Sequence, residues 1–162
     1  MRFLKHLLIP HWWAVRAFSS DVLRQIESAI KASERKHDGE LRFAVEGGIK
    51  LWLLLNGRTP RARAIEIFSQ LKVWDTEHNS GVLIYVQLVD RRIEIVADRG
   101  ISARVEPSRW QDICRQMEQS FRKGAYAEGA LQAIEAITAL LAKHFPPRGG
   151  NPNELPDKPV VL

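Results

Sequence analysis

Oxygen-bearing side chains gather in two short stretches of the sequence, residues 75–79 and 98–100. Asp75, Asn79 and Asp98 carry carboxylate and amide oxygens, the hard ligands that suit Ca²⁺ or Mg²⁺. Arg99 carries a guanidinium that can hold an anion through two parallel hydrogen bonds. Asp75, Asn79 and Asp98 are therefore candidate metal ligands, and Asp98 and Arg99 are candidate catalytic residues. The ligand spacing of an EF-hand is absent, so turn formation and a local ion pair are the favoured alternative.

Histidine and glutamate also lie close together at two places, which raises the question of a transition-metal site. His37 lies near Glu34 and Glu40, and His78 follows Glu77. The sequence has no His-Glu-x-x-His motif and no paired cysteine. A solvated helix end is therefore the favoured interpretation of both places.

A predicted antiparallel hairpin brings the two oxygen-rich stretches together. Residues 82–86 form an apolar run that is typical of a strand buried on both faces, and residues 93–97 alternate in a second strand. Asp90 and Arg91 leave room only for a tight turn, which predicts an antiparallel hairpin, 82–89/92–97. A turn centred there pairs positions whose numbers sum to about 181, so Leu83 faces Asp98. The loop of residues 75–79 then lies at the same end of the sheet as Asp98 and Arg99.

The remaining elements are predicted from periodicity and capping residues. Residues 41–45 alternate between apolar and polar and indicate a half-buried strand. Thr59 followed by Pro60 is typical of a helix start. Residues 49–55 are apolar but too short to separate strand from helix. The predicted helices cover residues 21–36, 60–73, 107–123 and 125–144.

Composition indicates one non-secreted domain. The chain has 162 residues, 45% apolar and 27% charged, and no apolar run approaches a bilayer-spanning length. The single cysteine, Cys114, is expected to be a buried structural thiol, with a reactive thiol as the alternative. Arg2, Lys5 and Arg16 supply three of the five net charges. The one local basic cluster, residues 58–63, lacks interleaved aromatic residues, so nucleic-acid binding is not expected.

Three segments are expected. Residues 1–18 are basic and aromatic, with Trp12 and Trp13, and either pack on the domain, which is favoured, or lie in a membrane interface. Residues 19–145 form the folded domain. Residues 146–162 are rich in proline and have little to bury, which predicts an extended tail.

The sequence resembles the TPM domain family over most of its length. Upstream and downstream segments, residues 33–46 and 153–159, are similar to short bacterial members. The central motif residues are Arg63-Ala64, Phe68, Asp75-Thr76, the run from Asn79 to Val86, the run from Ile93 to Ile101, and Phe121-Arg122-Lys123-Gly124. The resemblance extends to plant thylakoid-lumen TPM proteins.

The resemblance implies a three-layer α/β/α sandwich, with a small mixed sheet and helices on both faces. It also implies two properties reported for family members, acid phosphatase activity and calcium binding. Asp75, Asn79 and Asp98 match family-typical polar positions. The Asp-rich entry segment of many members is missing from this chain.

Three functions are therefore expected. The first is a TPM module that binds a protein partner and a divalent cation, in a cell-envelope or stress-maintenance role. A membrane-associated protein is one candidate for the partner. The second is a metal-assisted acid phosphatase, in which the ion polarises a phosphoryl oxygen. The third is a peripheral membrane binder acting through residues 1–18. The expected location is the cytoplasm or the inner surface of the inner membrane. The motifs of serine hydrolases, P-loop enzymes and dinucleotide-binding enzymes are absent.

Overall fold

The computed structural model describes residues 17–47, 59–149 and 152–162 of the chain. The expectations for residues 1–16, including Trp12 and Trp13, and for residues 49–55 lie outside the described residues. Phe18 is described, and only 2% of its surface is exposed. The chain therefore enters the hydrophobic core just before its first described helix.

The fold is built on a mixed sheet whose four described strands have the order β3-β2-β1-β4. The parallel pair at the centre is β1 (Glu40–Glu46) and β2 (Gly81–Gln87), and both strands are buried along their whole length. β3 (Arg92–Ala97) pairs antiparallel with β2, and β4 (Val160–Val161) pairs parallel with β1. The predicted mixed sheet with an antiparallel hairpin is confirmed.

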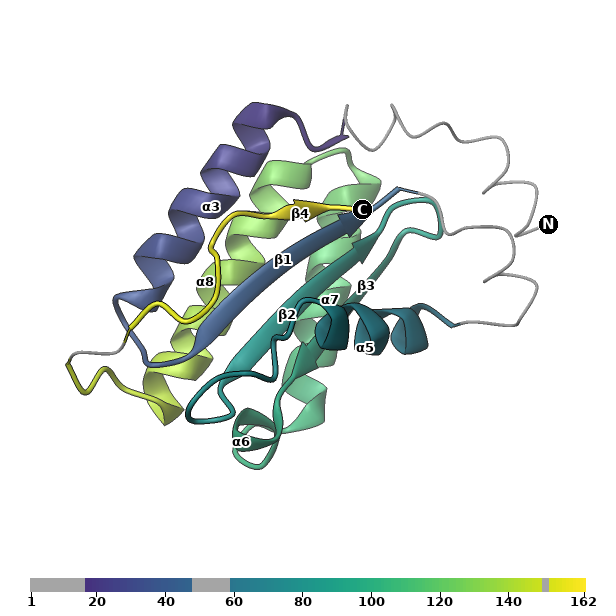
Figure 1. Cartoon of the computed structure of the whole chain (residues 1–162). Helices are drawn as coiled ribbons and strands as arrows, with labels where there is room; N and C mark the ends of the chain where they lie inside the picture. The colour runs from purple at the N-terminus through teal and green to yellow at the C-terminus, as the bar shows by residue number, and fades with distance from the viewer. Residues whose placement is uncertain (1–16, 48–58, 150–151) are drawn as a thin grey trace.

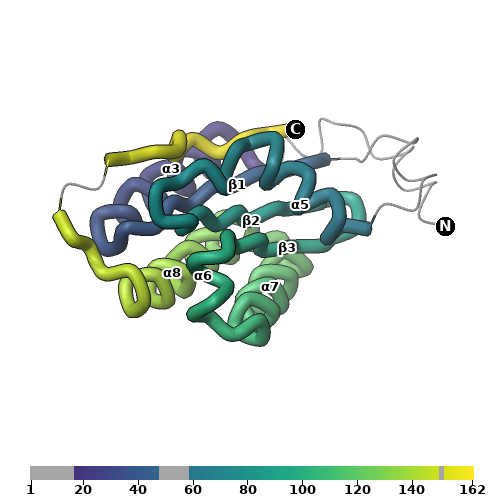
Figure 2. The backbone as a smooth tube through the Cα atoms, turned by 60° about the horizontal axis from the view of Figure 1, so that its bottom comes forward, coloured from purple at the N-terminus to yellow at the C-terminus, as the bar shows by residue number. Residues whose placement is uncertain are grey.

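Helices cover both faces of this sheet, which confirms the three-layer sandwich (Figures 1 and 2). One face carries α5 (Pro60–Gln70), and the other carries α3 (Ser20–Glu34), α7 (Pro107–Arg122) and α8 (Tyr126–His144). The short α6 (Arg99–Ser102) follows β3. Thr59 caps α5 and Pro60 opens it, as predicted.

Alternation along the strands creates two cores. Phe43, Val82 and Ile84 pack with α3, α7 and α8 in the larger core. Ala44 and Tyr85 pack with α5 in the smaller one. Successive side chains of a strand point to opposite faces, so a sheet covered on both sides needs apolar residues at nearly every position. The continuous apolar run of β2 meets this need.

The predicted register of the hairpin is wrong by two positions. Leu83 pairs with Val96, not Asp98, and the last pair is Gln87 with Arg92. The register differs because the hairpin loop consists of residues 88–91: the N–H of Arg91 donates to the carbonyl oxygen of Leu88 at 3.1 Å, and Arg91 has a φ of 53°. A shift of two keeps every side chain on its predicted face.

The C-terminal segment is extended, but the expectation that it has little to bury is wrong. Leu155 is 7% exposed and belongs to the smaller core. Asp157 is 8% exposed. The segment runs beside β1 and ends in β4 (Figure 1). The prolines of the segment are compatible with this position, because an edge strand does not need a hydrogen bond from every backbone N–H.

Candidate functional site

The candidate site lies where β2 begins and β3 ends. The backbone N–H of Asp98 donates to the carbonyl oxygen of Gly81 at 2.9 Å, which joins the two strand ends. Ser80, just before β2, is 1% exposed, and its N–H donates to Thr76 Oγ1 at 2.9 Å. The loop of residues 75–79 is thereby fixed beside Asp98, as the hairpin prediction requires.

Asp98 caps α6 with only one of its two carboxylate oxygens. Oδ1 accepts a hydrogen bond from the backbone N–H of Arg99 at 2.7 Å. Oδ2 is buried and has no hydrogen-bond partner among the described residues. A buried carboxylate oxygen without a partner is unfavourable. Oδ2 is thus an acceptor site that the protein itself leaves unsatisfied.

Asn79 and Arg99 hold the two loops together through direct contacts. Arg99 Nε donates to Asn79 Oδ1 at 3.0 Å, and the N–H of Gly100 donates to the carbonyl oxygen of Asn79 at 3.1 Å. Asn79 has a φ of 51°, a left-handed conformation that asparagine tolerates better than most residues. A Cβ on Gly100 would lie 2.7 Å from the carbonyl oxygens of both His78 and Asn79, so glycine is required there.

Asp75 is not joined to this cluster. It is exposed, and its N–H donates to the carbonyl oxygen of Lys72 at 2.9 Å. Among the described residues, no hydrogen bond or ion pair links its side chain to Asn79, Asp98 or Arg99. The structure therefore brings together three of the four predicted site residues.

A second polar cluster at the same end of the sheet contains Glu34 and Glu40, and the interpretation of these residues as part of a solvated helix end is wrong. Glu40 is 1% exposed, and its Oε2 accepts a hydrogen bond from the N–H of Leu155 at 3.0 Å. Glu34 Oε1 accepts from the N–H of Leu41 at 3.0 Å. Burial, together with the nearby carboxylates of Glu40 and Asp157, raises the pKa of Glu34 to about 9. The sequence contained one indication of this cluster, because the segment around Leu155 and Asp157 resembles family members. Nothing in the sequence showed which residues this segment contacts.

His37 is a core residue, so its interpretation as part of a solvated helix end is wrong. The side chain is 0% exposed. Its Nδ1 accepts from the N–H of Gly39 at 3.1 Å, and its Nε2 lies 2.8 Å from Ser33 Oγ. Burial lowers the pKa of His37 to about 4. The ring is therefore neutral at physiological pH and supports the turn into β1.

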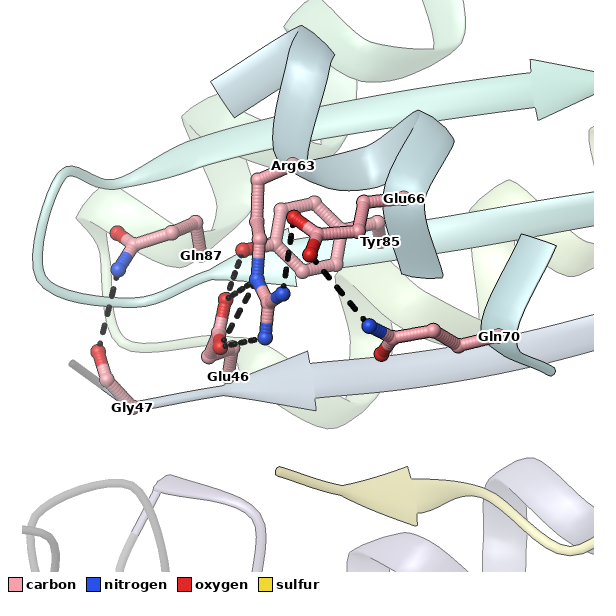
Figure 3. Close-up of polar contacts among 7 residues, drawn as sticks. All are labelled: Glu46, Gly47, Arg63, Glu66, Gln70, Tyr85 and Gln87. Carbon is pink, nitrogen blue, oxygen red and sulfur yellow. Dashed lines mark hydrogen bonds and ion pairs between the residues drawn. The ribbon is translucent and has the colours of Figure 1, made fainter. Parts of the chain in front are cut away.

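Part of the basic cluster of residues 58–63 has a structural role (Figure 3). Arg63 Nε and Nη2 donate to the carboxylate of Glu46, at 2.7 Å for the shortest contact, and Arg63 also pairs with Glu66 at 3.1 Å. The hydroxyl of Tyr85 donates to Glu46 from β2. Burial and the Glu46 carboxylate raise the pKa of the Tyr85 phenol. The three side chains connect α5, β1 and β2.

The chemistry of the candidate site favours a hard, hydrated cation. Asp98 Oδ2 and the amide oxygen of Asn79 are oxygen donors, and Mg²⁺ and Ca²⁺ complete their shells with water and carbonyl oxygens. Over the part of the chain that the structure describes, no group of three or more His, Cys, Asp or Glu side chains is placed to hold a metal ion.

Comparisons with known proteins agree on one family. A family model described as the TPM domain matches residues 14–140. The solution structure of the BA42 protein from the psychrophilic bacterium Bizionia argentinensis is similar, with a TM-score of 0.76 and 28% identity over 89% of this chain and 94% of that one. The N-terminal domain of a P. gingivalis protein shares the fold, with a TM-score of 0.60 and 19% identity over 86% and 94% of the two chains. The search of curated proteins gave no match.

The helices of the described ranges were also compared with the requirements for crossing a bilayer. None of them combines sufficient length with sufficient apolar character.

Proposed function

The chain belongs to the TPM domain family. We propose that it is a binding module for a divalent cation, Ca²⁺ or Mg²⁺, and that Asn79 and Asp98 bind the ion at the end of the sheet. The observation that carries this proposal is the buried, unpartnered Oδ2 of Asp98. A bound cation would be the partner that this oxygen lacks among the described residues. The capping bond from Arg99 N–H to Oδ1 keeps the carboxylate oriented while Oδ2 binds.

The neighbouring residues have distinct roles in the proposal. Asn79 contributes its amide oxygen, which a cation shares with, or takes from, Arg99 Nε. Asp75 is exposed on the adjacent loop and adds negative charge near the site without fixing the ion. The positive charge of Arg99 opposes the cation and sets an upper limit on its affinity.

Calorimetric titration of Ca²⁺ and Mg²⁺ into the full chain tests this assignment. Asp98→Asn keeps a good helix cap but removes the charge, and it is expected to weaken binding at least tenfold, since loss of a charged ligand commonly costs more than about 1.4 kcal/mol. Asp75→Asn is expected to have a smaller effect. Arg99→Gln is expected to tighten binding because it removes the opposing charge.

The matched control is Asp112→Asn, which removes an exposed carboxylate on α7 that pairs with Arg115. It should leave cation affinity unchanged. Equal weakening by Asp98→Asn and Asp112→Asn would mean that the ion responds only to net charge, and the assigned site would be wrong.

Phosphomonoester hydrolysis is the second candidate, and the position of Arg99 favours it. The side chain is exposed, and Nε is the guanidinium atom that bonds to Asn79. The terminal nitrogens are then available for a phosphoryl oxygen beside Asp98, in a geometry suited to bidentate contact. A cation at Asp98 would polarise the same group.

Hydrolysis of p-nitrophenyl phosphate with and without added Mg²⁺ distinguishes the enzyme from the binding module. If the chain is a phosphatase, turnover should depend on the metal and disappear in Asp98→Asn. Arg99→Lys should raise the KM, because lysine cannot form the bidentate contact. Turnover that survives in Asp98→Asn would contradict this site. An absence of turnover in a chain that binds the cation would leave the binding module as the function.

A further inference from the structure

A cleft borders the outer edge of β3, at the opposite edge of the described sheet from β4. β3 is an edge strand among the described strands, and it lies between α5 and α7 (Figure 2). A cavity of about 490 Å³ follows this edge. Its walls include Arg61 from α5 and Trp110, Cys114 and Glu118 from α7. The volume is in the range of sites that bind small molecules or a few residues of peptide.

Backbone groups of β3 face into this cleft. In an antiparallel pair, alternate residues direct their N–H and C=O groups away from the partner strand. For β3 these residues are Ile93 and Ile95. The N–H of Ile93 donates to Glu118 Oε1 at 3.4 Å, and the carbonyl oxygen of Ile95 accepts from Arg61 Nη1. Cys114 of α7 lines the same cleft.

These side-chain contacts are of a kind that an added strand can replace. The bond from Ile93 is long. The Arg61 side chain is 51% exposed, so it can leave Ile95 and remain hydrated. Burial raises the pKa of Cys114 to about 12, which keeps the thiol neutral and unreactive. The cleft is therefore suited to hydrogen bonding and not to covalent chemistry.

The two sides of the cleft differ in character. Arg61 from α5 and Arg92 from β3 have side chains 51% and 61% exposed. Their guanidinium groups lie 3.6 Å from Glu94 and 3.7 Å from Glu118, and such exposed pairs are weak enough for acidic side chains of a partner to replace. On the α7 side lie Trp110 and Pro107. With Arg115, the lining contains three arginines against the glutamates at positions 94 and 118, a balance of one positive charge. Arg115 also pairs with Asp112, which lies outside the lining. A strand beside β3 would place alternate side chains on these two sides.

We propose that the β3 edge binds an extended segment of a protein partner, in which acidic and apolar residues alternate, by adding it to the sheet as a further strand. Main-chain bonds form with Ile93 and Ile95, and the acidic side chains face Arg61 and Arg92. The apolar side chains cover Pro107, which is exposed, and the 8% of the Trp110 surface that is exposed. This surface does not depend on the cation site, because Asp98 lies beyond the end of β3.

A labelled short peptide of alternating glutamate and valine, titrated into the full chain without divalent cations, tests the proposal. Fluorescence anisotropy should report saturable binding that weakens as salt is added. Amide hydrogen exchange of Ile93 and Ile95 should slow in the complex, since their N–H groups gain regular partners. Failure of the peptide to bind, or binding without slower exchange at these two amides, would overturn the proposal.

Two controls separate strand addition from charge attraction. A peptide of the same sequence with N-methylated backbone amides keeps its charge but cannot donate main-chain bonds, and it should not bind. Arg92→Ala should weaken binding about three- to fivefold, as expected for one exposed charge, while Lys143→Ala on α8 should not. Equal binding of both peptides, or equal effects of both substitutions, would contradict the assigned surface.

Discussion

The two oxygens of one carboxylate, Asp98, have different environments, and this difference carries the functional assignment. Oδ1 caps α6, whereas Oδ2 is buried without a partner among the described residues. Sequence reasoning placed Asp98, Arg99 and Asn79 together because a hairpin fixes which strand ends meet. It also included Asp75, which is exposed and whose side chain has no hydrogen bond or ion pair with the other three among the described residues. The contacts of a loop residue depend on backbone bonds that periodicity does not encode.

At the same scale, the Glu34 carboxyl makes stability depend on pH. Its folded pKa of about 9 lies above its ordinary value of 4.5. The folded protein therefore holds a proton that the unfolded chain releases, and this contribution to stability is full below about pH 4.5 and is lost as the pH rises towards 9. Glu34→Gln should flatten this loss. Urea unfolding at several pH values between about 5 and 9, the range set by these two pKa values, measures this loss of stability.

The control for this effect is Glu128→Gln, a substitution at an exposed position in the first turn of α8. It should leave the dependence of stability on pH as it is in the wild-type protein, because it removes only an exposed carboxylate. A wild-type protein whose stability does not fall on the alkaline side would contradict the raised pKa of Glu34.

At the scale of elements, α5 is fixed to the sheet by a polar contact as well as by its apolar face (Figure 3). Arg63 and Tyr85 both bond to Glu46, a side chain that is 5% exposed at the end of β1. Periodicity predicted α5 and both strands, because each buries a regular apolar pattern. The polar contact was not predicted, because Arg63 resembled its neighbours Arg58 and Arg61 in the sequence.

Removing Arg63 should therefore destabilise the fold strongly. Arg63→Ala leaves the buried Glu46 carboxylate with the Tyr85 hydroxyl as its remaining side-chain partner, and a loss of about 3 kcal/mol is expected. Arg24→Ala removes an exposed pair with Asp21 and should cost less than about 0.5 kcal/mol. Urea unfolding of the two variants gives both values. Equal losses would mean that the contact beneath α5 contributes no more than a surface pair.

The C-terminal segment also acts as an element of the fold. Leu155→Ala removes a buried side chain from the smaller core and should lower the free energy of unfolding by about 2–3 kcal/mol. Val161→Ala, at a residue 39% exposed in β4, should cost well under half as much. The comparison is made by urea unfolding. A loss at Leu155 no larger than that at Val161 would show that the segment is only loosely attached.

At the scale of the whole molecule, the sandwich separates two candidate surfaces. The proposed cation site lies where β2 begins and β3 ends, and the cleft runs along β3, an edge strand among the described strands. The resemblance to the TPM family implied the three-layer architecture and the mixed sheet, and the continuous apolar run of β2 agrees with a sheet covered on both faces. The cleft and the docking of the tail were not predicted, because both depend on contacts between segments far apart in the chain.

Binding of a divalent cation by Asp98 and Asn79 can be measured with a titration of Ca²⁺ and then Mg²⁺, followed through the backbone amide shifts of the full chain. Saturable shifts centred on Asn79 and on Asp98, Arg99 and Gly100 are expected, and they should disappear in Asp98→Asn. Saturable shifts centred elsewhere, or no shifts at these amides at saturating cation, would contradict binding at this site.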